Sequence, residues 1–470
     1  MTPAKLRVKA DGSLRRLAEG RVLLGGSPLS VMRLTARGAR LLDEWLGGAP
    51  VSDVPAHRRL VRVLTDRGAV HPVREGTSRT ARDVTVVVPV RDDAEGLARL
   101  LPRLTGVART VVVDDGSAVP VPGAAVRHES ARGPAAARNA GWRLARTEFV
   151  LFCDADVVPE DGWLEPLLRH MEDADVAAVA PRVLSVPGAG ALARYEEDRP
   201  SLDLGGCPAP VRPGSRVSYV PAAALLVRTS ALRRHGGFDE GMRFGEDVDL
   251  VWRMAGAGDR VRYEAEAVVR HRPRPDWTAW VRQRFGYGTS AAPLALRHGR
   301  AVAPVRMSPW TALSWAAVAA GRPWAGAAVA GVTASLLPRK LAGSGVPADE
   351  ALRLALLGHL GGGRVLADAV TRAWWPVAVP VLAASRPGRL LLTAAFARHV
   401  DEWRRVRPRT GLPRWCLIRI ADDAAYGAGV WWGALRHRTV APLLPDLADW
   451  PPRAGRAAAG RHEDCSVGSA

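Results

Sequence analysis

Short runs of apolar residues alternate with amphipathic segments through the middle of the chain. Val84 to Val88, Thr110 to Val113 and Phe149 to Phe152 are apolar or β-branched throughout, which is typical of strands buried on both faces of a sheet. Between the first two runs, Ala94 to Leu104 has the spacing of an amphipathic helix. This alternation predicts an α/β domain built on a Rossmann-like mixed sheet.

The alternation continues beyond the third predicted strand. Trp163 to Met171 is expected to form a helix and Val176 to Pro181 a strand. Leu184 to Arg216 is rich in proline and glycine, so we expect a long loop or insertion near the site. Val217 to Val227 then returns as a strand, and Val268 to His271 ends the last one.

The first 76 residues carry a pattern of their own. The predicted elements are, in order, a hairpin of Val22 to Leu24 with Ser30 to Leu34, a helix of Ala36 to Leu46 capped by Thr35, a helix of about Ala56 to Asp66, and a strand of Ala69 to Val73. This winged-helix pattern resembles the PqqD-like modules, which hold a precursor peptide by adding a strand to their sheet. A structural cap or a DNA-binding winged helix is the alternative, since fold does not fix function.

Three apolar runs without charged side chains lie between residues 301 and 450. They are Met307 to Gly321, Pro323 to Pro338 and Ala373 to Ser385. Each is shorter than the roughly 20 residues that a membrane-spanning helix needs. We therefore expect peripheral or re-entrant membrane helices, with a buried helical domain as the alternative. The Gly-, Ala- and Arg-rich tail, residues 451–470, is predicted to be disordered.

The formal net charge of +19 lies mainly in the two ends of the chain. Residues 1–78 hold 14 basic and 7 acidic side chains, and residues 301–470 hold 21 and 11. A nucleic-acid binder would concentrate its basic excess on one element with interleaved aromatic residues, so nucleic acid is not expected as a partner. Basic segments beside apolar runs instead favour the cytoplasmic face of the cell membrane.

The cysteines and the first residues indicate the compartment. Cys153, Cys207, Cys416 and Cys465 show neither paired nor metal-type spacing, which favours a reducing compartment and no structural zinc. The N-terminal residues carry charge and no apolar segment, so no cleaved secretory signal is expected. The sequence therefore predicts a cytoplasmic protein.

Two carboxylates, Asp154 and Asp156, follow the predicted strand Phe149 to Phe152 in the motif D-A-D. At the end of an extended strand, positions i and i+2 share a side, so both carboxylates can face one ligand. Ligands of open α/β sheets bind at the carboxyl ends of strands, and oxygen ligands suit Mg²⁺ or Mn²⁺ carrying a diphosphate. The alternative is a capped turn with Asp156 as the cap of a helix.

Two further motifs follow the same logic. Asp115 lies in D-D-G-S after the second strand, where a glycine allows close approach and a carboxylate could accept the N3 hydrogen of a uracil. An Asx-turn is the alternative. Gly133 to Gly141 begins a helix whose free amides and Arg138 could face phosphate, although an ordinary capped helix also begins this way.

Acidic residues and a histidine complete the candidate chemistry. Glu246 and Asp247 fall in the first turn of a predicted helix, where they could act in catalysis or merely cap the helix. His271 ends a predicted strand and could be a further metal ligand, although a lone histidine is usually structural.

Six motifs occur in the order V-V-V-P-V, D-D-G-S, A-R-N-A-G, D-A-D, G-G-F-D-E and E-D-V-D-L-x-x-R. In this order they resemble the family 2 glycosyltransferases of the GT-A fold over about residues 83–290. Together with the N-terminal module and the apolar C-terminal region, the chain resembles the glycosyltransferases of mycofactocin biosynthesis, which act on a peptide-derived redox cofactor. The implied domains are a module at 1–76, a nucleotide-diphospho-sugar transferase domain at 83–300, a helical region at 301–450 and a tail at 451–470.

The resemblance also implies roles for individual residues. Asp247, with Glu246, would supply the catalytic base, and Asp156 with His271 would hold Mg²⁺ or Mn²⁺. Asp115 would bind the uracil and Asp154 the ribose of a UDP-sugar. The implied donor-binding residues are Pro89, Asp92, Asp115, Arg138 and Asp154.

The implied reaction is inverting transfer of a sugar, glucose from UDP-glucose, onto a premycofactocin-like acceptor as a β-1,4-linked oligomer. Gln283 to Gly288 departs from the Q-x-x-R-W pattern of processive polymerases, which puts processive growth in doubt. Two other interpretations stay open: a membrane-associated glycosyltransferase for lipid or cell-wall polysaccharide, and a non-catalytic peptide-binding adaptor. The intact carboxylates favour an enzyme, the N-terminal module a peptide-derived acceptor, and the apolar runs a lipid or glycan.

Overall fold

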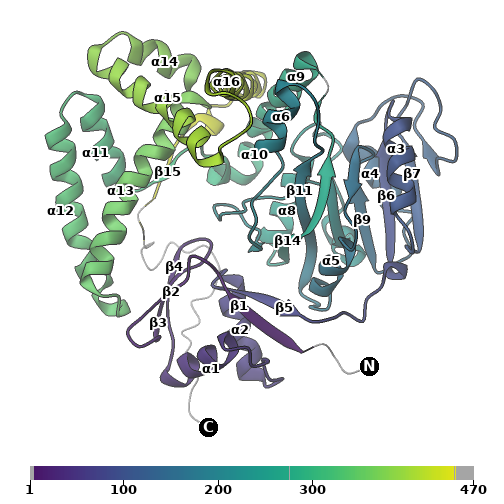
Figure 1. Cartoon of the computed structure of the whole chain (residues 1–470), viewed down its shortest axis with the longest axis horizontal. Helices are drawn as coiled ribbons and strands as arrows, with labels where there is room; N and C mark the ends of the chain where they lie inside the picture. Colours follow the sequence, from purple (N-terminus) through teal and green to yellow (C-terminus); the bar gives the residue numbers. More distant parts are fainter. Residues whose placement is uncertain (1–4, 275, 449, 451–470) are drawn as a thin grey trace. The chain divides into compact units, whose positions relative to one another are not determined.

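A computed structural model describes residues 5–274, 276–448 and 450 (Figure 1). The contacts between residues divide the chain into two compact units. The first consists of residues 1–12, 26–28 and 45–277, and the second of residues 13–25, 29–44 and 278–470. The predicted boundary at residue 76 does not coincide with this division, because the N-terminal strands have partners in both units.

The first unit is built on a nine-stranded sheet. Its strands lie in the order β10-β14-β11-β13-β9-β6-β7-β8, with β12 paired to β14. In chain order they are β6 (Val84–Val90), β7 (Arg109–Asp114), β8 (Val126–Arg127), β9 (Phe149–Cys153), β10 (Val157–Pro159), β11 (Val176–Ser185), β12 (Ala209–Pro210), β13 (Ala224–Arg228) and β14 (Arg260–His271).

Both strand directions occur in this sheet. β6 pairs in parallel with β7 and with β9, whereas β13 runs antiparallel to β9 and β11. The predicted α/β fold with a mixed sheet is therefore confirmed. Because Ala224 of β13 stands opposite Cys153 of β9, the residues that precede β13 reach the carboxyl end of β9.

Helices cover both faces of the sheet. Val86 of β6 packs in one apolar cluster with Leu97 and Leu167. On the other face, a Cβ added to Gly141 would stand 2.3 Å from Cγ1 of Val87. Alternate residues of β6 thus meet different helices, which explains why the strand is apolar throughout. The helices of this unit that follow residue 83 are α3 (Ala94–Leu100), α4 (Pro134–Trp142), α5 (Leu164–His170), α6 (Ala191–Asp198), α7 (Thr229–His235) and α8 (Glu246–Gly256).

The predicted loop Leu184 to Arg216 is more ordered than expected, because it contains α6 and β12. The next strand is shorter than predicted, since β13 begins at Ala224 and not at Val217. Val217 forms only an isolated bridge, with Val211. Beside it, Oγ of Ser215 donates to the carbonyl of Arg212 at 2.8 Å and lies 2.7 Å from the carbonyl of Val217.

The N-terminal elements follow the predicted pattern closely. The hairpin of β3 and β4 is present, with Leu23 opposite Met32, and Gly38 donates its N–H to Oγ1 of Thr35 at 3.1 Å. Two strands, β1 and β2, were not predicted. The elements are β1 (Leu6–Ala10), β2 (Arg15–Leu17), β3 (Val22–Gly25), β4 (Ser30–Arg33), α1 (Ala36–Leu46), α2 (Pro55–Asp66) and β5 (Val70–Arg74).

These N-terminal strands form two separate sheets. β1 pairs only with β5, in the first unit, whereas β2, β3 and β4 form a three-stranded sheet in the second unit. There Val22 packs with Leu341 and Ala351, and Nη2 of Arg15 donates to Oε1 of Glu350 at 2.8 Å. The hairpin therefore completes its apolar core with residues from the C-terminal third of the chain.

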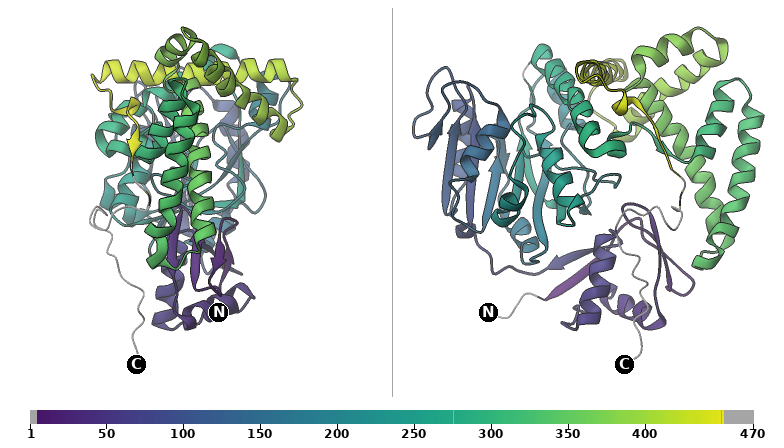
Figure 2. Two further views of the ribbon diagram at one scale, coloured as in Figure 1. Left: turned by 90° about the vertical axis from the view of Figure 1, so that its left-hand side faces the viewer. Right: turned by 180° about the vertical axis from the view of Figure 1, so that it is seen from behind.

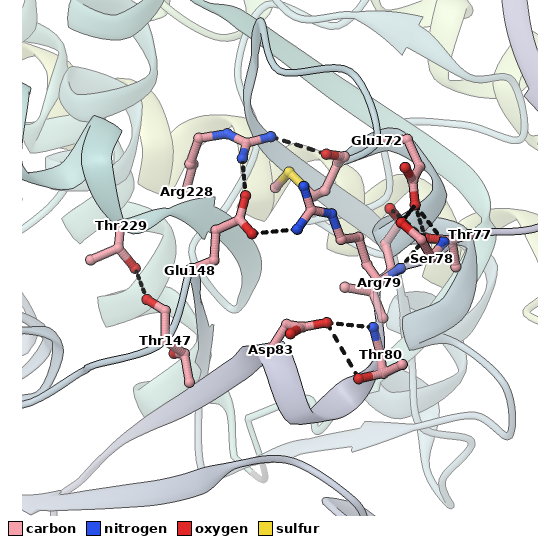
Figure 3. A network of polar contacts seen from close by, with 12 residues as sticks. Thr77, Ser78, Arg79, Thr80, Asp83, Thr147, Glu148, Glu172, Arg228 and Thr229 are labelled. Carbon is pink, nitrogen blue, oxygen red and sulfur yellow. Dashed lines mark hydrogen bonds and ion pairs between the residues drawn. The ribbon is translucent and has the colours of Figure 1, made fainter. Parts of the chain in front are cut away.

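The predicted linker, Glu75 to Ser78, is anchored to the first unit (Figure 3). Oε1 of Glu172 accepts hydrogen bonds from the hydroxyls of Thr77 at 2.7 Å and Ser78 at 2.8 Å. Burial raises the pKa of Glu172, but these hydrogen bonds lower it by a larger amount. The pKa of Glu172 therefore lies below its usual value. In the same network, Arg79 and Arg228 both bind Glu148. The connection into β6 is held in place by side chains.

Helices make up most of the second unit. They are α9 (Trp277–Thr289), α10 (Ala291–His298), α11 (Pro309–Ala319), α12 (Pro323–Leu341), α13 (Ala348–Thr371), α14 (Trp375–Ala383), α15 (Arg386–Val406) and α16 (Leu412–Arg436). The three predicted apolar runs thus correspond to α11, α12 and α14. The long yellow-green helix in the left view of Figure 2 is α16, which packs against α10, α14 and α15.

Short elements complete the chain. β15 (Arg306–Met307) pairs in parallel with β16 (Asp446–Leu447). The 3₁₀ helices are η1 (Ala81–Asp83), η2 (Leu101–Arg103), η3 (Gly299–Val302), η4 (Ala342–Ser344) and η5 (Ala441–Leu443). The tail that is predicted to be disordered, residues 451–470, lies outside the described residues.

Within the described residues, no single helix has both the length and the apolar composition needed to cross a bilayer. The bent pair α13 and α14 meets the two requirements only when the helices are taken together, and it bends by 102°.

Charged side chains are buried between the helices of the second unit. Asp423 of α16 accepts from Nη1 of Arg372 at 2.7 Å and also pairs with Arg419. Nε of Arg284 on α9 lies 3.2 Å from Oδ1 of Asp422. Because a buried charge is tolerated only beside opposite charges, these pairs fix how the helices meet.

Replacing Asp423 with Ala is expected to destabilise the protein by about 1.5–3 kcal/mol, because Arg372 and Arg419 each lose their nearest carboxylate. Asp422 stays beside Arg372, and Glu402 stays beside Arg419. Urea denaturation of the full chain measures this loss. Asp401→Ala is the matched control: its partner Arg405 is exposed, so its removal should cost about 0–1 kcal/mol. Equal losses for the two variants would contradict a stabilising role for the buried cluster.

Candidate active site

The D-A-D motif forms a turn at the end of β9. The N–H of Asp154 donates to the carbonyl of Ala223 at 2.9 Å, and the carbonyl of Asp154 accepts from the N–H of Val157 at 3.1 Å. This differs from the predicted extended strand end, because the second hydrogen bond reverses the chain into β10. As a result, Asp154 and Asp156 have different partners.

Asp156 pairs with basic residues at and just after the end of β14. Its Oδ2 lies 3.2 Å from Nε2 of His271 and 3.6 Å from Nη2 of Arg274. Burial raises the pKa of Asp156, but His271 and Arg274 lower it by more, to about 2. Burial lowers the pKa of His271, but Asp156 outweighs this, and the pKa lies above its usual value. Asp156 is therefore an ionised carboxylate at neutral pH.

Asp156 and His271 fit a divalent cation as a pair of ligands. In the part of the chain that the structure describes, no group of three or more His, Cys, Asp or Glu side chains is arranged to hold a metal ion. Mg²⁺ is commonly held by one or two carboxylates together with substrate phosphates, so two protein ligands suffice when a diphosphate completes the shell. The two side chains remain 17% and 14% exposed, so a cation can reach them.

Arg138 of α4 joins two of the predicted site residues. Its Nη2 donates to Oδ1 of Asp154 and its Nη1 to Oε1 of Glu246, both at 2.7 Å. The guanidinium carbon also stands 5.5 Å from the centre of the Phe238 ring. Arg138 was predicted to face phosphate. In the structure it is buried and holds two carboxylates together through Nη1 and Nη2, while its Nε has no hydrogen-bond partner among the described residues.

Glu246 and Asp247 begin α8 beside this arginine. Burial raises the pKa of Glu246 and Asp247 raises it further, to about 7, against the effect of Arg138. Oδ2 of Asp247 accepts from the N–H of Ala222 at 3.0 Å, and Oδ1 accepts from its neighbour Val248 at 2.8 Å. Burial raises the pKa of Asp247 above its usual value, although Arg138 opposes this. Carboxylates with raised pKa values in one cluster are suited to accept a proton.

Because the pKa of Glu246 is raised in the folded protein, the free energy of unfolding is expected to fall as pH rises from about 4.5 to about 7. The unfolded chain releases this proton near pH 4.5, whereas the folded protein keeps it until about pH 7, so the folded state binds more protons in this window. Glu246→Gln cannot titrate and should lack this part of the decline. Urea denaturation across the window measures the slope. Exposed Glu95→Gln is the control, and an unchanged slope in Glu246→Gln would contradict the assignment.

Two other residues of the motif E-D-V-D-L-x-x-R, Asp249 and Arg253, hold the turn that precedes α8. Nε of Arg253 donates to Oδ2 of Asp249 at 2.8 Å, and Nη2 donates to the carbonyl of Gly237 at 2.7 Å. The amide of Asn139 fixes the other side, because its Nδ2 donates to the carbonyl of Phe238 at 2.8 Å. Gly237 has a φ of +74°, and an added Cβ would stand 2.4 Å from Oδ1 of Asn139. G-G-F-D-E is thus a structural turn that follows α7 and is held by side chains of α4 and α8.

Asp115 is buried at the end of β7 and is already well bonded. Its Oδ1 accepts from the N–H of Arg132 at 2.9 Å and contacts Nδ1 of His128 at 2.7 Å. Its Oδ2 accepts from the N–H of Gly133 at 2.8 Å. The carboxylate therefore ties β7 to the start of α4. Within the described residues three of its four acceptor positions are used, which leaves one on Oδ2 for a ligand.

Asp92 and Pro89 lie on the neighbouring strand and loop. Asp92 has a φ of +52°, and its Oδ1 accepts from the N–H of Ala118 at 2.8 Å. Its own N–H donates to Oγ of Ser117 at 3.0 Å. Pro89 stands opposite Val113 in the pair of β6 with β7. Both residues thus shape the edge of the sheet where Asp115 lies.

The structure brings most of the predicted residues to one edge of the sheet, in two groups. Arg138, Asp154, Glu246 and Asp247 form one group, whereas Asp156 pairs with His271. Sequence reasoning missed His128 and Arg274, because neither belongs to a recognisable motif. It also missed that Ala222 contacts Asp247, since a backbone donor leaves no signal in residue type.

Comparisons with known proteins identify the family of the chain. The family model for glycosyl transferase family 2 matches residues 85–216. Pre-mycofactocin glycosyltransferases from two strains of Mycobacterium tuberculosis are 41% identical over 467 residues, which cover 95% of this chain and 98% of theirs. The succinoglycan biosynthesis protein ExoU of Rhizobium meliloti is 28% identical over 214 residues, covering 40% of this chain and 60% of that protein.

A solved structure is also similar. The chain of a mannosyltransferase from Pyrobaculum calidifontis, in complex with GDP-mannose and Mn²⁺, matches with a TM-score of 0.42 and 17% identity. The match covers 76% of this chain and 89% of that one. The likeness is too weak to support an argument on function.

Proposed function

The chain belongs to the family 2 glycosyltransferases and is related to the glycosyltransferase of the mycofactocin system, and on this premise we propose that it transfers a sugar from a nucleotide diphosphate to a peptide-derived acceptor. The transfer is metal-dependent and inverts the anomeric carbon. UDP-glucose is the proposed donor and a β-1,4-linked oligomer the proposed product. The sugar and linkage rest on family resemblance alone.

One observation carries the proposal: Arg138 holds Asp154 and Glu246 together beside Asp247. Buried carboxylates repel each other, and an arginine between them allows a dense acidic cluster to persist at the end of β9. Such a cluster supplies a base for the acceptor and a contact for the donor in one place. A structural role alone would not require two carboxylates at the start of α8.

In this proposal the base is Asp247. It takes the proton of the acceptor hydroxyl as that oxygen bonds to the anomeric carbon, while the bond from this carbon to the diphosphate oxygen breaks and its electron pair leaves with the nucleotide. A single displacement of this kind inverts the configuration. Arg138 keeps Glu246 and Asp154 in position during the step, so that the site needs little rearrangement.

Asp156 and His271 would hold Mg²⁺ or Mn²⁺, which would neutralise charge on the departing diphosphate. Asp154 and the remaining acceptor position of Asp115 are proposed to contact the ribose and the uracil. Pro89 and Asp92 frame the same edge of the sheet. Arg138 contributes indirectly, since both ends of its guanidinium group already bind carboxylates.

Mass spectrometry of products tests the proposal. The full chain is incubated with Mg²⁺ or Mn²⁺, several nucleotide sugars and a peptide-derived acceptor. A hexose added to the acceptor only with UDP-glucose supports it. A hexose added instead to a lipid or polysaccharide acceptor supports the second candidate, a membrane-associated glycosyltransferase, which the exposed apolar side chains of the second unit favour. Absence of transfer with every donor and acceptor overturns both.

We further propose that the helices of the second unit bind the cytoplasmic face of the cell membrane. Large apolar side chains are exposed on them, with Trp324 of α12 at 87% and Val381 of α14 at 65%. Arg386 and Arg389 of α15 follow in the chain and could meet anionic lipid headgroups. The N-terminal module is proposed to bind a precursor peptide, as its resemblance implies.

Replacing both Trp324 and Val381 with Glu is expected to reduce binding to anionic liposomes at least several-fold, because charged groups oppose insertion at the interface. Flotation of the full chain with liposomes measures the bound fraction at low and high salt. Val119→Glu is the control, since Val119 is equally exposed but lies in the first unit. Wild-type protein that fails to float with either neutral or anionic liposomes would contradict the proposal.

A further inference from the structure

A short segment, residues 212–222, is anchored by an ion pair between Arg216 and Asp11, which directly follows β1. Nη2 of Arg216 donates to Oδ2 of Asp11 at 2.8 Å, and Nη1 donates to Oδ1 at 3.3 Å. The N–H of Arg216 also donates to Oγ of Ser27 at 2.6 Å. The side chain of Asp11 is only 1% exposed, and His71 contacts it as well, at 2.8 Å. Arg216 is therefore held by several hydrogen bonds, and all of the residues involved belong to the first unit.

The other end of the 212–222 segment reaches the proposed catalytic base. The N–H of Ala222 donates to Oδ2 of Asp247 at 3.0 Å, and the carbonyl of the next residue, Ala223, accepts from the N–H of Asp154 at 2.9 Å. Midway, the carbonyl of Ser218 accepts from Nε1 of Trp252 on α8 at 2.6 Å. The segment therefore contacts α8 at two points, one of them the base itself.

Between these ends the 212–222 segment has little freedom to move. Oγ of Ser218 donates to the carbonyl of Ser215 at 2.9 Å, and Oγ of Ser215 bonds locally as described above. Val217 and Val220 are fully buried. A segment fixed by side-chain bonds and burial passes on a displacement at one end, whereas a loose loop would absorb it.

We propose that Arg216 is a positioning residue for sugar transfer: anchored by Asp11 and Ser27, it sets the place of the Ala222 N–H and thereby of the Asp247 carboxylate. This inference rests on the proposed function, because it assigns the acceptor proton to Asp247. It also gives the N-terminal strands a part in the chemistry beyond binding a peptide.

The Ala222 N–H has an electrostatic effect on Asp247 as well. Burial raises the pKa of this carboxyl and the charge of Asp154 raises it too, whereas Arg138 and the N–H of Ala222 lower it. Glu246 is the adjacent acid. Displacing Ala222 should therefore raise the pKa of Asp247 and move the acidic limb of the rate profile to higher pH.

Arg216→Met tests the inference, because methionine keeps the length of the side chain and removes its charge. We expect kcat for transfer to fall by roughly 10- to 100-fold, the usual cost of misplacing a reacting group, with KM for the nucleotide sugar unchanged. The acidic limb should move to higher pH. Arg216→Lys, which can still pair with Asp11, should recover part of the rate. Arg169→Met is the control, since Arg169 forms an exposed pair with Glu165 on α5.

If Arg216→Met fails to fold, Ser27→Ala tests the positioning role of Arg216 instead. It removes only the bond to the N–H of Arg216 and should lower kcat several-fold with the same shift in pH profile. Folded variants with wild-type kcat and an unmoved profile would overturn the inference, and so would a loss in KM alone. A wild-type protein that transfers no sugar would instead overturn the proposed function, so the two failures are distinguishable.

Discussion

Replacing Asp247 with Asn is expected to lower sugar transfer by roughly 10²- to 10⁴-fold, the usual worth of a positioned proton transfer, while binding of the nucleotide sugar stays near its wild-type level. An amide has nearly the shape of the carboxylate but cannot take the acceptor proton. It can accept from Ala222 or from Val248 through its oxygen, but not from both. The loss of one hydrogen bond is small beside the expected loss of rate.

Transfer is measured at saturating donor and acceptor, and donor binding by calorimetry with Mn²⁺ present. Asp259→Asn is the matched control, because Asp259 pairs with His235 outside the cluster of carboxylates. If Asp247 only capped α8, asparagine would serve as well, since Asn and Asp are comparable caps. Transfer by Asp247→Asn at nearly the normal rate would therefore remove Asp247 from the mechanism.

Replacing Asp156 with Ala is expected to abolish metal-dependent donor binding and transfer together. Asp156 is the ionised partner of His271, with a pKa of about 2, and its loss leaves one protein ligand for the cation. A diphosphate without its counter-charge binds weakly and leaves poorly. This result would contrast with that for Asp247→Asn, in which binding survives and only the rate falls.

Titration of the nucleotide sugar, with and without Mg²⁺ or Mn²⁺, measures the effect. Asp161→Ala is the control, because this exposed residue lies close to Asp156 in sequence but has no place in the site. Donor affinity in Asp156→Ala that still rises on adding metal would show that the cation is held elsewhere. Activity of the wild-type protein in the presence of a chelator would point the same way.

The sequence predicts the central strands well because their signal is local. Every residue of Val84 to Val88 is apolar or β-branched, since helices cover both faces of β6. The hairpin of β3 and β4 is also local, because its turn residues lie between the two strands in the sequence. β1 was missed although Leu6 to Ala10 alternates apolar and basic residues, as a half-buried strand does. Its partner β5 lies far along the chain, so the pairing itself leaves no local signal.

The candidate site could be predicted as a set of residues but not as an arrangement. The motifs place Asp154 and Glu246 at the ends of their elements, yet Arg138 joins them across separations of 16 and 108 residues. No local pattern encodes such pairing. The turn at D-A-D likewise depends on a backbone bond from Val157 to Asp154, so the two acids face different partners.

The hairpin of β3 and β4 has a consequence for synthesis of the chain. Arg15 and its partner Glu350 are 335 residues apart, and Val22 packs against residues of the same late region. At roughly 5–20 residues per second, the ribosome needs on the order of half a minute to supply that partner. Throughout that time Val22 can pack with Leu17 and Val31 but lacks Leu341 and Ala351. The hairpin is thus made early but can complete its packing only after α13 has emerged from the ribosome.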